Sequence, residues 1–202
     1  STDGTVEEVR RRAAADGRIR LLIREGSAAG GNVCRNLGMQ ESRGRFLVFL
    51  DSDDLLEPDC LGRRAEVMER NADLDFALFH SKIFERVPGD LGDSIDDELC
   101  GDDLMRFLFL EFPWATTAPV WRKTSLMNLG GFDETLPSWQ DVELHLRAIC
   151  TGAKYLKFPQ PDHYFRRQSD AAKVSTEQRR SPLHLHAAME TFAKFERLVS
   201  NG

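Results

Sequence analysis

The feature that most constrains this chain is an apolar run that ends abruptly in acidic residues. The five residues from Phe46 to Leu50 are all apolar, and Asp51, Ser52, Asp53 and Asp54 follow directly. An uninterrupted apolar run of this length is typical of a central strand that is buried on both faces. Ligands of open α/β sheets bind beyond the carboxyl ends of strands, so the pattern predicts a ligand site at this acidic turn.

The chemistry of the acidic turn favours a divalent cation. Three carboxylates within four residues repel one another, which is costly unless a cation neutralises them. Oxygen ligands select a hard ion such as Mg²⁺ or Mn²⁺. A surface turn whose aspartates cap the next helix is the structural alternative. Phosphatases and phosphotransferases also carry acidic clusters after a strand, so the cluster alone names no reaction.

The rest of the chain alternates between helical and extended patterns. Thr5 and Glu8 fit a capping box, Asp102 fits an N-cap, and Ser181 followed by Pro182 fits a helix start. We expect helices at 5–15, 30–39, 59–70, 103–110, 141–150 and 182–199, and strands at 19–23, 46–50, 75–84, 118–121, 154–158 and 163–167. Strands that alternate with helices predict an α/β sheet covered by helices on both faces.

Composition excludes several classes of protein. The 202 residues suggest one domain, and a hydrophobic fraction of 41% is enough for a core. The net charge of −6 argues against a nucleic-acid partner, which needs excess Lys and Arg. No apolar run approaches the roughly 20 residues of a membrane span, and Ser1 to Arg12 lacks an apolar signal core. The four cysteines lack zinc-ligand spacing, which indicates reduced thiols in a cytoplasmic protein.

Two further segments carry residues that can bind or react. Small residues open the predicted helix near Gly30, and Arg35 on that helix can pair with phosphate oxygens. Helix packing is the alternative explanation of those small residues. Asp141 lies at a junction between a loop and a helix, after the Gly130 to Glu134 turn. A carboxylate in that position can be an N-cap or a catalytic group.

Taken in order, these segments resemble one family. The runs AGGNVCRNLG, GRFLVFLDSDD, GGFDE and WQDVELHLR are similar to family 2 glycosyltransferases of the GT-A fold, over residues 1–170. The resemblance implies an α/β, Rossmann-like mixed sheet of the nucleotide-diphospho-sugar transferase type, with helices on both faces. We expect residues 1–180 to form this domain, entered part-way at STDGT, without the family's first strand and the start of its DDGS segment. We expect residues 181–202 to form a helix packed on the same domain.

The resemblance also implies roles for residues on the donor side. Asp51, Ser52 and Asp53 occupy the DxD position, where Asp53 and Asp51 would bind Mn²⁺ or Mg²⁺ and Asp51 would face the ribose or the donor sugar. Arg35 would lie near the phosphates of a nucleotide-diphospho-sugar donor. Arg166 falls where the family often places a positive residue near the leaving diphosphate.

Other positions match the acceptor side and the base. Asp141 matches the catalytic base of inverting members, which would activate a hydroxyl of a glycan or lipid-linked acceptor. Gly131, Phe132 and Trp139 would form walls on the acceptor side. Asn36 and Asp54 would support the neighbouring loop and turn. Assembly of a glycan or a cell-surface polysaccharide is the setting common in the family, and peripheral association with the inner face of the membrane is compatible with it.

The chain departs from the family pattern at several positions. Gln140 stands where many members carry a Glu, and Gln168 stands where a His often follows, which puts a third metal ligand in doubt. His163 lies nearby, and a lone His beside a strand is more often structural than metal-binding. No QxxRW motif follows. The alternatives are a non-catalytic module that binds a sugar nucleotide or a glycan, and a metal-dependent phosphotransferase that leaves WQDVE unexplained.

Overall fold

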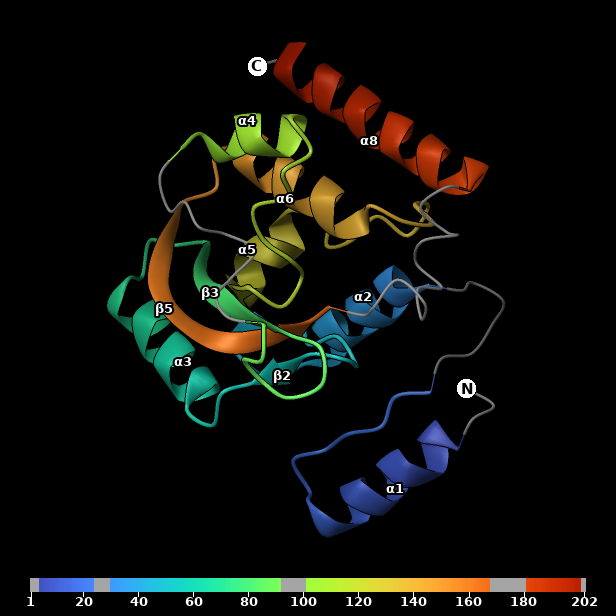
Figure 1. Ribbon diagram of the computed structural model, residues 1–202, viewed down its shortest axis with the longest axis vertical. Helices are drawn as coiled ribbons and strands as arrows, with labels where there is room; N and C mark the ends of the chain where they lie inside the picture. Colours follow the sequence, from blue (N-terminus) through green and yellow to red (C-terminus); the bar gives the residue numbers. More distant parts are fainter. Residues whose placement is uncertain (1–3, 24–29, 92–100, 168–180, 201–202) are drawn as a thin grey trace.

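The computed structural model describes residues 4–23, 30–91, 101–167 and 181–200 (Figure 1). Helices alternate with strands along this part of the chain, as the sequence predicts. The helices are α1 Thr5–Ala15, α2 Gly31–Glu41, α3 Cys60–Arg70, α4 Asp103–Leu108, α5 Lys123–Asn128, α6 Gln140–Cys150 and α8 Pro182–Ser200. The strands are β1 Phe46–Val48, β2 Leu55–Leu56, β3 Phe76–Phe84, β4 Pro119–Arg122 and β5 Tyr155–Arg166. The predicted connection at 87–101 lies partly outside the described residues.

The strands form one mixed sheet in the order β1-β4-β3-β5-β2. β3 and β5 are parallel, and the other neighbours are antiparallel. The two strands expected at 154–158 and 163–167 are a single strand, β5, whose register against β3 shifts between Phe79 and Ser81. The prolines at 159 and 161 suggest a break in the sequence, but β5 passes them as a local irregularity of pairing.

Helices cover both faces of this sheet, and each interface has its own apolar cluster (Figure 1). α3 lies on one face, where Met68 packs with Phe79 and Val120. α4, α5 and α6 lie on the other face over the larger cluster, and α8 packs across α6. Phe76 is fully buried there between Trp121 and Tyr155. α1 lies apart from the sheet and has no buried residue.

Two strand predictions are wrong in the described residues. β1 ends at Val48 and pairs only with β4, so it is an edge strand of this sheet and not a central one. Leu50, which the buried-strand interpretation places in the core, is 50% exposed. Residues 19–23 form no strand and lie largely exposed. An apolar run reports a tendency to be buried, but a strand forms only where a neighbour completes its hydrogen bonds.

The helix-start predictions had different outcomes. The capping box at Thr5 is wrong, because Gly4 is the N-cap and the Glu8 carboxylate pairs with Arg11 and Arg12. The predicted cap at Asp102 is confirmed: its carboxylate accepts the backbone N–H groups of residues 104 and 105. The hydroxyl of Ser181 likewise accepts the N–H of residue 184 at the start of α8. Competing arginines one turn along explain why the Glu8 carboxylate faces away from the helix start.

A buried ion pair joins α3 to β5 beneath the acidic turn. The guanidinium of Arg64 donates two hydrogen bonds to Asp162, at 2.8 and 2.7 Å, and both side chains are 1% exposed. Burial alone would raise the pKa of Asp162, but the bonds from Arg64 and His163 lower it to about 2. His163 lies 3.0 Å from the same carboxylate and is fully buried, which agrees with a structural role for this histidine.

Asp162→Asn is expected to lower the free energy of unfolding by about 3 kcal/mol at pH 7, because it leaves the buried Arg64 without its counter-charge. The folded-state pKa of Asp162 is depressed, so its contribution is complete above the unfolded value of 3.8 and is lost as the pH falls toward 2. Urea denaturation at several pH values measures the free energy of unfolding of the variant and of the wild type. A difference between variant and wild type that is the same at pH 7 and pH 2.5 would contradict the assignment.

Candidate active site

Asp54 connects the acidic turn after β1 to β5 and to the segment that precedes β4. Its buried carboxylate accepts the Thr117 hydroxyl at 2.8 Å and the backbone N–H of Arg166 at 3.0 Å. Burial raises the pKa of Asp54 to about 6, and these two hydrogen bonds offset part of the rise. Asp54 therefore holds the turn from inside, while Ser52 stays exposed and Asp51 and Asp53 are half-buried.

Two arginines meet this turn from different elements. Arg35 on α2 forms an ion pair with Asp51 at 2.5 Å, and its guanidinium lies over the ring of Phe132, 5.4 Å from the centroid. Arg166 at the end of β5 donates to the backbone carbonyl of Asp53 at 3.0 Å. Its guanidinium also lies over Phe84 and donates to the carbonyl of residue 85. The predicted donor-side residues thus lie together around the turn.

Two adjacent threonines join the acidic turn to Asp141. The hydroxyl of Thr116 lies 3.3 Å from the Asp141 carboxylate, and that of Thr117 lies 2.8 Å from Asp54. Consecutive Cα atoms are about 3.8 Å apart, so this dipeptide links the two carboxylates through neighbouring residues. Asp141 is in the first turn of α6, where its other oxygen accepts the N–H of Val142. No motif in the sequence points to these threonines; the one local signal is a pair of hydroxyl residues just ahead of β4.

The Gly130 to Glu134 loop bridges α2 and α6. The side-chain amide of Asn36 donates to the carbonyl of Phe132 and accepts its N–H, both at 2.8 Å. Gly131 has φ +70°, and a Cβ there would lie 2.6 Å from the Asn36 oxygen, so this position requires glycine. Asn32 donates to the carbonyl of Asp133 at 2.7 Å. The loop is therefore held against the same helix that carries Arg35.

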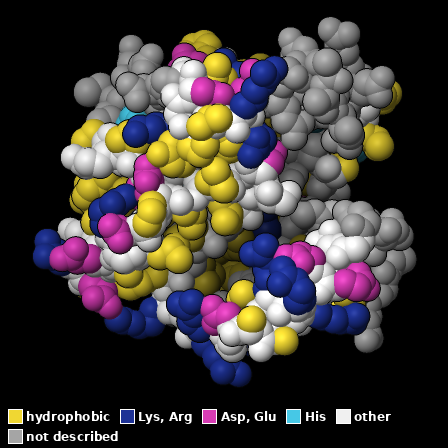
Figure 2. All heavy atoms as spheres, turned by 60° about the horizontal axis from the view of Figure 1, so that its bottom comes forward, with side chains coloured by type: hydrophobic (Ala, Val, Ile, Leu, Met, Phe, Trp, Pro, Cys, Tyr) yellow, Lys and Arg dark blue, Asp and Glu magenta, His cyan; other side chains and the backbone are white. Residues whose placement is uncertain are grey.

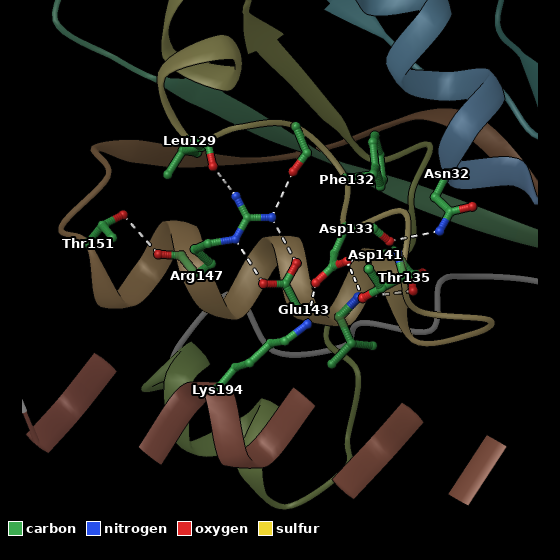
Figure 3. A network of polar contacts seen from close by, with 12 residues as sticks. Asn32, Leu129, Phe132, Asp133, Thr135, Asp141, Glu143, Arg147, Thr151 and Lys194 are labelled. Carbon is green, nitrogen blue, oxygen red and sulfur yellow. Dashed lines mark hydrogen bonds and ion pairs between the residues drawn. The ribbon is translucent and has the colours of Figure 1, made fainter. Parts of the chain in front are cut away.

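The other side of this loop is held by α6 and α8 (Figure 3). The guanidinium of Arg147 binds both carboxylate oxygens of Glu143, at 2.8 Å each, and donates to the carbonyls of Leu129 and Gly131. Lys194 reaches from α8 to form an ion pair with Asp133. Glu143 and Arg147 belong to the WQDVELHLR run, and their spacing of four residues puts them on one face of the helix.

Arg147→Ala is expected to lower the free energy of unfolding by about 3 kcal/mol, because Glu143 keeps a buried charge without a partner and two loop carbonyls lose their donor. Urea denaturation measures the loss. Arg12→Ala is the matched control: Arg12 also pairs with a Glu four residues away, but it is 64% exposed, so the change should stay below about 1 kcal/mol. Equal losses in both variants would contradict a role of Arg147 in holding the loop.

The donor set at the turn suits a hard divalent ion, although the residues that the structure describes do not complete a site by themselves. No group of three or more His, Cys, Asp or Glu side chains is gathered for a metal within the described part of the chain. Mg²⁺ and its relatives are commonly held by one or two carboxylates together with substrate phosphates. Asp51 and Asp53 on one fixed turn match that pattern. Gln168 lies outside the described residues.

A comparison with known families decides the relationship. The family model described as Glycosyl transferase family 2 matches residues 1–112. This chain belongs to glycosyl transferase family 2. TuaG of Bacillus subtilis (strain 168), which has a provisional name as a teichuronic acid biosynthesis glycosyltransferase, is 31% identical over 52% of this chain and 42% of its own length. The uncharacterized glycosyltransferase MJ1057 of Methanocaldococcus jannaschii is 24% identical over 73% of this chain and 53% of its own.

Solved structures share the fold of this family 2 chain. TarS of S. aureus in complex with UDP-GlcNAc superposes with a TM-score of 0.66 at 20% identity, over 88% of this chain and 51% of the other. The mannosyltransferase PcManGT of Pyrobaculum calidifontis, in complex with GDP-Man and Mn²⁺, superposes with a TM-score of 0.60 at 18% identity, over 98% and 52%. The expected α/β GT-A fold is confirmed, and the chain spans about half the length of these relatives.

The surface of the family 2 chain carries charges of both signs. Figure 2 shows basic and acidic side chains interspersed with apolar ones on the face that brings α1 and α3 forward. Among the described helices, none has the length and apolar character that crossing a membrane requires.

Proposed function

We propose that this protein transfers a glycosyl group from a nucleotide-diphospho-sugar to a hydroxyl of a glycan or lipid-linked acceptor, with inversion at the anomeric carbon. The observation that carries the proposal is the Thr116–Thr117 bridge, which holds Asp141 beside the acidic turn. Membership of family 2 supports a nucleotide-sugar donor. The donors in the TarS and PcManGT structures, UDP-GlcNAc and GDP-Man, support it further.

In this proposal Asp141 is the general base. An acceptor hydroxyl is a poor nucleophile, and a carboxylate that takes its proton during attack lowers the barrier. The oxygen then attacks the anomeric carbon from the face opposite the diphosphate, which leaves with the bonding electrons. No covalent intermediate with the protein is required. Thr116 orients one oxygen of the carboxylate, and the N–H of Val142 in the first turn of α6 binds the other.

On the donor side, the departing diphosphate gains negative charge that needs stabilisation. When bound at Asp51 and Asp53, Mn²⁺ or Mg²⁺ supplies positive charge beside the diphosphate. In this scheme, Arg35 exchanges its partner Asp51 for phosphate oxygens of the donor. The contact of its guanidinium with the ring of Phe132 keeps the side chain near the turn during this exchange. Arg166 supports the turn, because its guanidinium donates a hydrogen bond to the backbone carbonyl of Asp53.

A donor panel tests the proposal on the full-length chain. UDP- and GDP-sugars are screened by thermal shift with Mn²⁺, and the best binder is then followed for release of nucleotide without acceptor. We expect one nucleotide class to raise Tm and to be hydrolysed slowly. A shift without any turnover, with or without acceptor, would indicate a binding module instead. Release of phosphate from simple phosphoesters would indicate a phosphotransferase.

A further inference from the structure

The buried guanidinium of Arg64 also binds the segment that precedes β4. Its Nη1 donates to the backbone carbonyl of Thr117 at 2.8 Å, while Nε and Nη2 bind the two carboxylate oxygens of Asp162. The guanidinium carbon lies 5.0 Å from the centroid of the Phe79 ring, and Arg64 is fully buried, as Thr117 and Asp162 are. The planar fork of an arginine presents its donors in a fixed geometry, so this side chain sets the spacing between α3, β5 and the segment before β4.

Thr116 and Thr117 are the two central residues of a tight turn. The N–H of Ala118 donates to the carbonyl of Ala115 at 3.1 Å, which closes this turn. That bond does not use the carbonyl of Thr117, and a buried carbonyl needs a donor. Arg64 supplies the donor from outside the turn. The guanidinium therefore holds the backbone that carries both threonine hydroxyls.

The two segments that Arg64 joins both donate to Asp54. The hydroxyl of Thr117 comes from one segment, and the backbone N–H of Arg166 comes from the other. Arg166 and Asp162 belong to the same strand, β5. The contacts therefore form a closed cycle that begins and ends at the acidic turn, and Arg64 is the side chain that completes it.

Stability alone is a weak reason for a buried ion pair at this place. Removing two charges from water costs about as much as their attraction contributes, and apolar replacements of such pairs are often neutral or stabilising. We propose that Arg64 is a positioning residue for the reaction, an inference that rests on the proposed transferase function. Through the carbonyl of Thr117 it fixes the place of the neighbouring Thr116 hydroxyl, and so the orientation of Asp141 beside the acidic turn.

Two variants of the full-length chain that differ only at residue 64 test this role. Asp162→Asn keeps Arg64 and its bond to Thr117, whereas the double variant with Arg64→Met and Asp162→Asn loses the guanidinium and buries no unpaired cation. We therefore expect the double variant to resist urea at least as well as the single variant.

The rate of donor turnover should follow the opposite order. The kcat of the double variant should be about 10- to 100-fold below that of Asp162→Asn, because a misplacement of about 1 Å can cost about 100-fold. The KM for the nucleotide sugar should stay within about threefold, since Arg35 and Asp51 lie outside the cycle of contacts that Arg64 completes. A purely structural role would lower stability and turnover in the same order.

Hydrogen exchange of the Ala118 amide gives a readout that needs no substrate. This amide closes the threonine turn, so it should exchange at least about tenfold faster in the double variant than in Asp162→Asn. The amide of Arg122, which donates to the carbonyl of Asp75 at 2.8 Å, is the reference for general destabilisation. It should exchange no faster in the double variant than in the single one.

Equal exchange of the Ala118 amide in the two variants, or equal kcat, would overturn the inference. If circular dichroism shows that the double variant is unfolded, Arg64→Lys replaces it and is compared with wild type, because lysine keeps the charge but lacks the planar fork. The same two effects are then expected. A wild-type chain without any donor turnover would refute the transferase, and the exchange of Ala118 would still decide whether Arg64 holds the turn.

Discussion

Asp141→Asn is expected to lower glycosyl transfer by about 10²–10⁴-fold, the usual contribution of a general base, while nucleotide binding stays near the wild-type value. The amide has nearly the same shape as the carboxylate: its oxygen can still accept the N–H of Val142, and its NH2 group can donate to the hydroxyl oxygen of Thr116. What it lacks is the basicity to take a proton from the acceptor. Initial rates with saturating donor and calorimetric titration of the nucleotide measure the two effects separately.

The matched control is Asp59→Asn, an exposed aspartate at the N-terminus of α3 that makes no side-chain cap bond. This change removes the same charge at the start of another helix, away from Asp141, and should leave the rate of transfer unchanged. If Asp141→Asn impaired nucleotide binding as strongly as transfer, the residue would act in donor binding or folding. The assignment as base would then be wrong.

Asp53→Ala is expected to remove the dependence of nucleotide binding on Mn²⁺. Loss of a direct carboxylate ligand should weaken metal-supported binding by at least about 100-fold, since loss of an outer-sphere partner already costs 10- to 100-fold. The turn itself should persist, because Arg166 binds the backbone carbonyl of residue 53 and Asp54 holds its own partners. Calorimetry of UDP and GDP with Mn²⁺ and with EDTA gives the four affinities needed.

Asp73→Ala is the control for this experiment, because Asp73 is 70% exposed and lies at the other end of α3 from the turn. Its nucleotide affinities should equal those of wild type under both conditions. Binding by the wild-type chain that is equally strong in EDTA would contradict a metal at this turn. Mn²⁺-dependent binding retained in Asp53→Ala would move the ligand role away from Asp53.

The sequence predicted the family and the fold class better than the position of the strand that leads into the acidic turn. An apolar run ending in DSDD is a local pattern, and together with AGGNVCRNLG, GGFDE and WQDVELHLR it carried the resemblance to the family that the comparison confirms. The position of that run was predicted wrongly: burial on both faces suggested a central strand, and β1 is at an edge of the described sheet. Hydrophobicity reports a tendency to leave water, and it contains no information about which strand will be the neighbour.

The supporting residues were the hardest to predict. Thr117 reaches Asp54 across 63 positions of sequence, and the N–H of Arg166 reaches the same carboxylate across 112. Arg147 has a local partner in Glu143, which helical spacing predicts, but its bonds to the loop carbonyls depend on how α6 lies against that loop. Side chains of common types in long-range contact leave no periodic signal.

The sequence by itself determined which reactive groups the protein has, their order, and the α/β class, because residue type and local periodicity follow directly from the chain. Only the tertiary structure decided that Asp141 and the acidic turn meet through Thr116 and Thr117, and that His184 on α8 accepts the indole N–H of Trp139. These placements depend on the packing of helices on the sheet, where contacts between distant segments stabilise one arrangement out of many that the local patterns allow.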